Sequence, residues 1–165
     1  MSNGVLTNFM GLSSFLIGVP LPGLQSLDAS LGQEYLNQLN AYLQQGPAIF
    51  DQQVGAAETP PSSNAGLNAG TMTTLLNTWQ QIAAAGGDPT AQVNKQIFGN
   101  VQLSSLAQKI ILIWYTGLID GIPGPADTYD KALVWSLGYA HPMAVPRSFG
   151  YWQYDPTTTG IVDKK

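Results

Sequence analysis

The sequence predicts an all-α fold, a single-domain helical bundle spanning residues 1–165 with an irregular aromatic C-terminal arm. Three observations lead to this fold class. Apolar residues recur at intervals of three to four in several segments, as they do on one face of a helix. Gly and Pro clusters separate these segments, and no segment shows a useful length of strand-like alternation. The 165 residues are 44% apolar, which is enough to form a core.

The first predicted helix covers residues 26–45. Asp28 is a plausible N-cap, and Gly46-Pro47 ends the segment. One helical stripe contains the apolar side chains of this segment: Leu27, Leu31, Tyr35, Leu39 and Tyr42/Leu43. A small-residue, Pro/Gly/Ser-rich stretch over residues 55–70 then predicts a long, flexible surface loop.

The helical pattern returns over residues 71–85 and ends at Gly86-Gly87-Asp88-Pro89. Pro89 begins a short helix that extends through Val93 and Ile97. The segment 103–119 is the most apolar helix candidate, and a helix that is apolar on nearly all sides is usually central. Its expected buried side comprises Leu106, Ile110, Ile113, Trp114 and Gly117.

A turn over residues 120–125 follows, and Asp127 is expected to cap a helix over 129–139, with Asp130 at the capping-box position. From Ala140 the chain is aromatic and extended, so residues 140–165 form the predicted arm. Three prolines keep this arm out of a helix: Pro142, Pro146 and Pro156.

Charge is scarce and unevenly distributed. Only 10% of the residues are charged, against about 25% in a typical soluble domain. Residues 1–94 contain five carboxylates and no Lys or Arg, because the first basic residue is Lys95. This balance argues against nucleic-acid binding and against a polybasic membrane anchor. No apolar run is long enough for a membrane span, and no positively charged n-region marks an intact signal peptide.

Few residues suggest chemistry. His141 is the single histidine, and a structural loop role is favoured over general-base catalysis. Asp120, Asp127 and Asp130 could attract a hard cation, but their spacing is not that of a calcium loop, so a turn and a capped helix start are favoured. The chain lacks cysteine and any nucleophile-elbow, Walker or dinucleotide-binding pattern. We therefore expect no catalytic residue, no bound cofactor and no metal in this chain.

Aromatic residues are the most informative feature of the C-terminal third. Core packing accounts for about half of them, while a Pro-stiffened arm with so many rings is typical of an interface. The predicted partner interface comprises Trp114, Tyr115, Trp135, Phe149, Gly150, Tyr151 and Trp152.

Several segments, taken in order, resemble one protein family, the small subunit of bacterial membrane-bound, FAD-dependent sugar and polyol dehydrogenases. This family includes the sorbitol, fructose, gluconate and glucose dehydrogenase complexes. The resemblance covers nearly the whole chain, more loosely over residues 47–102. The matching segments are Phe9-Met10-Gly11-Leu12-Ser13, Leu27-Asp28 with Tyr35-Leu36, Trp114-Tyr115-Thr116-Gly117-Leu118, Tyr129-Asp130-Lys131-Ala132-Leu133-Val134-Trp135 and Gly150-Tyr151-Trp152.

The resemblance implies a partner and a location. In that family the small subunit binds a large flavoprotein of the glucose–methanol–choline type, which holds the FAD. The small subunit carries a twin-arginine leader and the folded flavoprotein is exported with it, so the complex lies in the periplasm at the inner membrane. A multihaem cytochrome c is a further subunit. This chain departs from the pattern in two ways, since it shows no leader and lacks the Cys with which some members cross-link to the large subunit.

The sequence and the resemblance together predict a non-catalytic accessory subunit, which acts as a folding, export and stability partner (a chaperone) for an FAD-dependent dehydrogenase. Without a cysteine, any complex must be held non-covalently. The alternative is a stand-alone periplasmic helical module whose aromatic arm and long loop bind a sugar or a peptide.

Overall fold

The computed structural model describes residues 3–19, 29–45, 66–120, 122–123, 128 and 131–137. This part of the chain is helical almost throughout, which confirms the predicted all-α fold class. The elements are α1 (Asn3–Ile17), α2 (Ala29–Gln45), α4 (Ala69–Ala85), α5 (Pro89–Val93), the π-helical turn η2 (Asn94–Phe98), α6 (Val101–Thr116), β1 (Leu118–Ile119), β2 (Ile122–Pro123) and α8 (Leu133–Leu137). The predicted arm over 140–165 lies outside the described residues, as does most of the predicted loop over 55–70.

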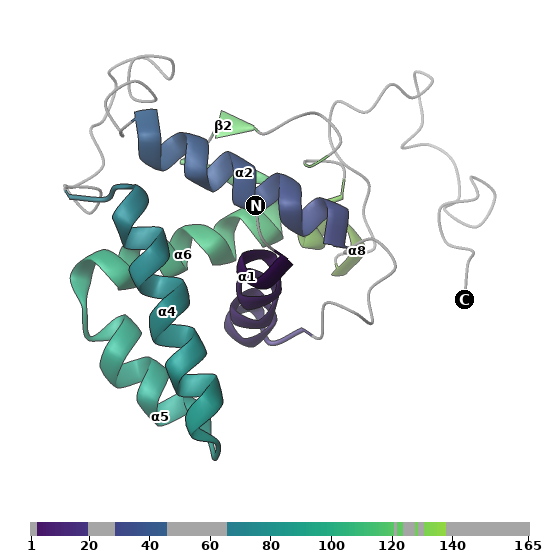
Figure 1. Cartoon of the computed structure of the whole chain (residues 1–165). Helices are drawn as coiled ribbons and strands as arrows, with labels where there is room; N and C mark the ends of the chain where they lie inside the picture. The colour runs from purple at the N-terminus through teal and green to yellow at the C-terminus, as the bar shows by residue number, and fades with distance from the viewer. Residues whose placement is uncertain are drawn as a thin grey trace, which may run out of the picture.

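Helix α6 occupies the centre of the described helices. It contacts α1, α2, α4, η2, α8 and β1, and Figure 1 shows it behind α1 and α4, with α2 crossing above them. The side that the sequence predicted to be buried is buried, including Leu106, Ile110 and Ile113. The prediction of a central, largely enclosed helix is therefore confirmed.

The C-terminal end of α6 differs from the prediction. The helix stops at Thr116 instead of continuing to residue 119, because Gly117 adopts a left-handed φ of 69° and its N–H donates to the Ile113 carbonyl at 2.8 Å. Glycine has no Cβ and reaches this conformation at little cost, so it commonly ends helices. The following residues Leu118 and Ile119 pair with Pro123 and Ile122 in a short antiparallel ladder.

Helix α1 was not predicted as a helix. Its sequence contains Gly, Asn, Thr and Ser at many positions, and these residues have modest helix propensity. Tertiary packing compensates for this weakness, because α1 contacts α2, α4 and α6 and inserts Phe9, Leu12 and Ile17 into the shared core. The helix is therefore stabilised by its neighbours more than by its own residues.

Side-chain caps define the start of α4 and α6. Asn68 accepts hydrogen bonds from the N–H groups of Gly70 and Thr71, and the Thr71 hydroxyl accepts one from the Asn68 N–H, which completes a capping box. Helix α4 thus begins at Ala69, so the last two residues of the predicted loop belong to a helix. Asn100 caps α6 in a similar way, accepting from Gln102 and Leu103.

Candidate partner-binding surface

Trp114, the first predicted interface residue, lies in the core. Its side chain is 0% exposed, its ring stacks near Phe9 with centroids 6.5 Å apart, and the ring of Tyr35 meets it edge-on at 4.7 Å. The indole N–H is buried and finds no hydrogen-bond acceptor in the described part of the chain. Trp114 therefore contributes no surface to a partner in this conformation. Its burial is the core packing that the sequence analysis expected for about half of these aromatic residues.

Tyr35 joins α2 to the segment that precedes α8. Its hydroxyl donates to the Thr128 carbonyl at 3.0 Å, and both residues are fully buried. Burial, and to a smaller extent the neighbouring Glu34 carboxylate, raise the pKa of the Tyr35 phenol above its usual range. This tyrosine therefore acts as a neutral structural donor.

The other predicted interface residues fall into two groups. Tyr115 and Trp135 are half-buried on α6 and α8, so each retains some accessible surface. The Tyr115 hydroxyl donates to the Ile17 carbonyl at 3.3 Å, which also ties α6 to the end of α1. The arm residues Phe149, Gly150, Tyr151 and Trp152 lie outside the described residues, as does His141.

Asp120 forms a polar centre with two core side chains. Its Oδ1 accepts from the Lys109 ammonium at 2.6 Å, and its Oδ2 accepts from the Tyr42 hydroxyl at 2.6 Å. The Lys109 nitrogen also lies 5.1 Å from the centre of the Tyr42 ring, a cation–π distance. Because both carboxylate oxygens are engaged, Asp120 fits the structural role that the sequence favoured for it.

Asp127 and Asp130, the other members of the predicted acidic cluster, lie outside the described residues. Where the structure describes the chain, no three His, Cys, Asp or Glu side chains gather as they would around a metal ion. No helix among the described residues is long and apolar enough to cross a membrane.

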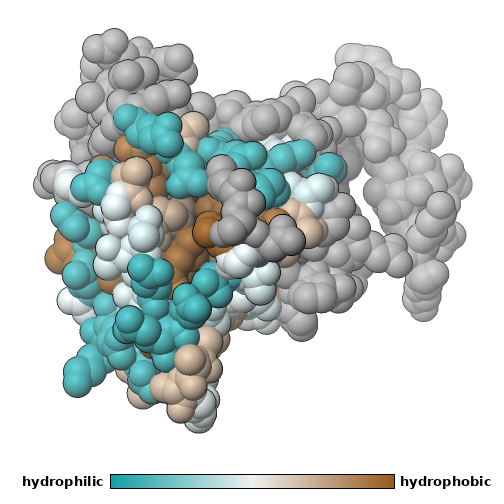
Figure 2. All heavy atoms as spheres, in the orientation of Figure 1, coloured by the Kyte–Doolittle hydropathy of each residue, from teal (hydrophilic) through white to brown (hydrophobic). Residues whose placement is uncertain are grey.

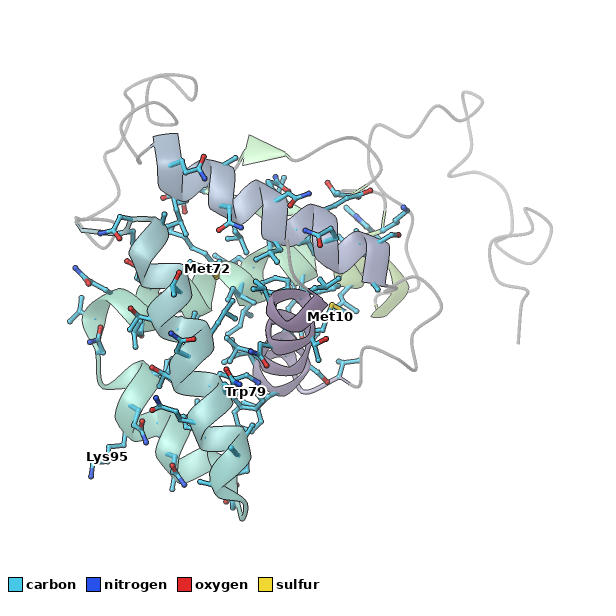
Figure 3. The ribbon with its side chains drawn as sticks, in the orientation of Figure 1. Met10, Met72, Trp79 and Lys95 are labelled. Carbon is cyan, nitrogen blue, oxygen red and sulfur yellow. The ribbon has the colours of Figure 1, made fainter. Side chains whose placement is uncertain are left out.

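The described helices carry very little charge. Helices α1, α4, α5 and α8 contain no charged residue, and the remaining elements contribute Glu34 in α2, Lys95 in η2 and Lys109 in α6. Of these three, Lys109 is buried and ion-paired, and Glu34 is half-buried. Lys95 is exposed and extends away from the helices in Figure 3. The helical surface is therefore composed mainly of Asn, Gln, Thr, Ala and apolar side chains.

Apolar side chains are exposed on the outer face of α6. Val101 is 78% exposed and Leu112 is 48% exposed. Positions 101, 108 and 112 share a face because eleven residues correspond to about three helical turns, and Gln108 between them is uncharged. The half-buried Tyr115 continues this face toward the end of the helix. The face is uncharged along its whole length, since Lys109 points into the core.

A groove lies where α1, α2 and α4 meet. It has a volume of about 210 Å³ and is lined by Val5, Asn8, Leu36, Asn40, Ala69, Met72, Thr73, Leu76 and Asn77. Its lining combines buried apolar side chains from α2 and α4 with carboxamides from all three helices. Figure 2 shows apolar surface, in brown, where these helices come together.

The seam between α1 and α4 continues below the groove. Gly11 faces the Trp79 indole, whose Nε1 would lie only 3.2 Å from a Cβ at this position, and Figure 3 shows Trp79 on the side of α4 that faces α1. Phe15 packs against the same indole with ring centroids 5.2 Å apart. The Asn8 carboxamide donates to the Gln80 side chain at 3.4 Å across the seam. The absence of a side chain at Gly11 thus permits close packing of the two helices beside the groove.

Sequence reasoning did not find the groove. Its residues come from three separate segments, one of which was not predicted to be helical, and its Asn and Thr residues resemble ordinary surface positions. The uncharged composition of residues 69–85 was the signal that could have drawn attention to this surface. Comparison with protein-family models, with curated proteins and with solved structures finds no match for this chain.

Proposed function

We propose that this chain is a non-catalytic accessory subunit that binds and stabilises a large FAD-dependent sugar or polyol dehydrogenase and supports its export to the periplasm. The observation that carries the proposal is the nearly charge-free helical surface with exposed apolar side chains. The sequence resemblance supplies the kind of partner. In this proposal FAD belongs to the partner, and a multihaem cytochrome c completes the complex at the inner membrane.

The physical argument concerns desolvation. A charged side chain loses its hydration when a partner covers it, so charged residues are depleted from the centres of protein interfaces. The described helices need little such desolvation, since Lys95 is the one exposed residue among their three charged ones. The same composition gives the isolated chain a surface poor in the charges that usually favour solubility. Both properties fit a subunit that functions inside a complex.

Co-expression tests the proposal. The chain, carrying an affinity tag, is expressed with a candidate large FAD flavoprotein of this dehydrogenase class, and flavin absorbance and sugar-dependent dye reduction are measured after purification. We expect both signals to co-purify with the chain in a fixed ratio, while the chain purified alone has neither. A flavoprotein that accumulates, is exported and is active to the same extent without this chain would rule the proposal out.

The groove supports a second candidate, a stand-alone module that binds a sugar or a peptide. Carboxamides beside an apolar floor suit a neutral ligand with hydroxyl or amide groups. However, a volume of about 210 Å³ falls below the roughly 300–1,000 Å³ of most small-molecule sites. Binding of a free sugar or peptide by the purified chain, measured by calorimetry in the absence of any flavoprotein, would favour this candidate over the first.

A further inference from the structure

We infer that Met10 is a peroxide-sensitive modification site, and that oxidation of its thioether loosens the crossing between α1 and α2. The site belongs to this chain alone and goes beyond the proposed function, because it needs no partner. Three observations lead to it: the position of the sulfur, the partial exposure of the side chain, and the contrast with a second methionine.

The sulfur of Met10 lies where α1 packs against α2. A Cβ added at Gly32 of α2 would overlap with Met10 Sδ, and Met10 Cε would lie 3.3 Å from it. Gly32 is buried, and Figure 3 shows Met10 where α1 passes α2. The missing side chain at Gly32 therefore leaves the space that the sulfur fills, so the thioether itself closes this helix crossing.

Met10 is also within reach of solvent. Its side chain is partly exposed, although it packs against the apolar core. Hydrogen peroxide is scarcely larger than water, so partial exposure is enough for it to reach the sulfur. The sulfur attacks one peroxide oxygen, the O–O bond breaks, an S–O bond forms and the other oxygen leaves as water. The thioether is thereby oxidised to a sulfoxide by two electrons, and the peroxide is reduced.

The sulfoxide fits the crossing poorly. It is polar and larger by one oxygen than the apolar thioether, and a polar atom that is buried without a hydrogen bond costs free energy. The new oxygen therefore either separates the two helices or draws the side chain of Met10 out toward water. In both cases the contact with Gly32 is lost. Helix α1 is sensitive to such a loss, because packing against its neighbours stabilises it more than its own residues do.

Met72 provides an internal comparison. It lies on α4 and is only 3% exposed, and Figure 3 shows it apart from Met10. Because oxidation of a methionine follows access to its sulfur, Met72 should react more slowly in the folded chain. Met1 and Met143 lie outside the described residues, and they are the same in every variant used below, so their oxidation is a constant background.

Peroxide treatment of the full chain and of two variants tests the inference. Met10→Leu removes the sulfur but keeps an apolar side chain of similar volume, and Met72→Leu is the matched control. After hydrogen peroxide has been removed, peptide mass spectrometry locates the added oxygen, and circular dichroism follows thermal unfolding. We expect Met10 to be oxidised before Met72. The melting temperature of wild type and of Met72→Leu should fall by at least about 3 °C, while that of Met10→Leu should stay within about 1 °C of its untreated value.

Repair provides a second measurement on the wild-type chain. Methionine sulfoxide reductases that together act on both sulfoxide epimers should restore the melting temperature as they reduce Met10. This measurement decides the question even if Met10→Leu does not fold.

Three results would overturn the inference. The first is a folded chain in which Met72 is oxidised while Met10 stays reduced. The second is an oxidised Met10 that leaves the wild-type melting temperature unchanged, or a treated Met10→Leu that loses as much as wild type. The third is a melting temperature that stays low after Met10 has been repaired. None of these results bears on the accessory-subunit role, which co-expression tests separately.

Discussion

Asp120 is a partly buried carboxylate that joins two buried side chains of the described core. It is the ion-pair partner of Lys109, whose side chain is only 8% exposed, and it also accepts from Tyr42. Its backbone has a positive φ of 50°, a conformation that Asn tolerates better than most residues. Asp120→Asn therefore removes the charge with little backbone strain. We expect the free energy of unfolding to fall by about 3 kcal/mol in chemical denaturation, because a buried ammonium is left without its counterion.

Two companion variants isolate the charge effect. Lys109→Met should be less damaging than Asp120→Asn, because the Asp120 side chain is 25% exposed and can be hydrated. The double variant should be more stable than the sum of the two losses predicts, since neither charge is then left alone. A loss below about 0.5 kcal/mol for Asp120→Asn, the size of an ordinary surface change, would show that the ion pair does not stabilise the fold.

Tyr35 makes the stability of the fold sensitive to alkaline pH. Its pKa is raised in the folded state, first by burial and then by Glu34, whereas the unfolded chain has the usual tyrosine pKa near 10. Above about pH 10 the unfolded state loses this proton first, so the stabilising effect is complete below that pH and is lost as the pH rises toward the raised pKa.

Tyr35→Phe checks this assignment. The variant should lose about 1 kcal/mol at neutral pH, because the hydrogen bond to the Thr128 carbonyl is removed. Its stability should then decline less steeply than that of wild type as the pH is raised above 10. Urea unfolding at a series of pH values measures both effects, and parallel pH profiles for the two proteins would contradict the role given to Tyr35.

Among the helices, α4 and α6 depend on Asn caps that no other described residue replaces. Asn68→Ala and Asn100→Ala should each lower the free energy of unfolding by about 1 kcal/mol, because N–H groups of the first turn lose their acceptor. Asn94→Ala is the matched control, since Asn94 is exposed within η2 and its side chain caps nothing. Equal melting temperatures for all three variants would show that the caps do not limit stability.

The sequence predicted helices where a strong apolar stripe coincided with clear end signals. The stripe of α2 is buried as expected, including Leu31, Leu39 and Leu43, and Pro89 begins α5 as predicted. Prediction failed where local signals were weak, as in α1, or where an apolar run continued past a helix end, as at Gly117. Tertiary packing determines the structure of α1, and backbone conformation determines the helix end at Gly117. The periodicity of apolar residues reveals neither of these effects.

For the molecule as a whole, composition reports how little charge the chain carries but not how its side chains are arranged. Only 10% of the residues are charged, and the structure adds that the described helices expose mainly uncharged polar and apolar groups. An aromatic count does not tell whether a ring faces inward, so Trp114 was assigned to the interface although it fills the core. The groove depends on three helices meeting, and that arrangement cannot be obtained from residue spacing within any one of them.

Salt should have little effect on assembly of the proposed complex. Between about 0.1 M and 1 M salt the screening length falls from about 10 Å to about 3 Å, which weakens exposed ion pairs strongly. The described helices expose few charges, and neither the groove nor the outer face of α6 contains an exposed one. Contacts of apolar and amide groups do not require such pairs, and added salt does not weaken burial of apolar surface.

The dissociation constant for the flavoprotein, measured by calorimetry at both concentrations, should therefore change by less than about threefold or decrease. A complex that weakens more than tenfold at 1 M salt would instead be held by charged groups, which would contradict a partner interface formed by the nearly charge-free helical surface.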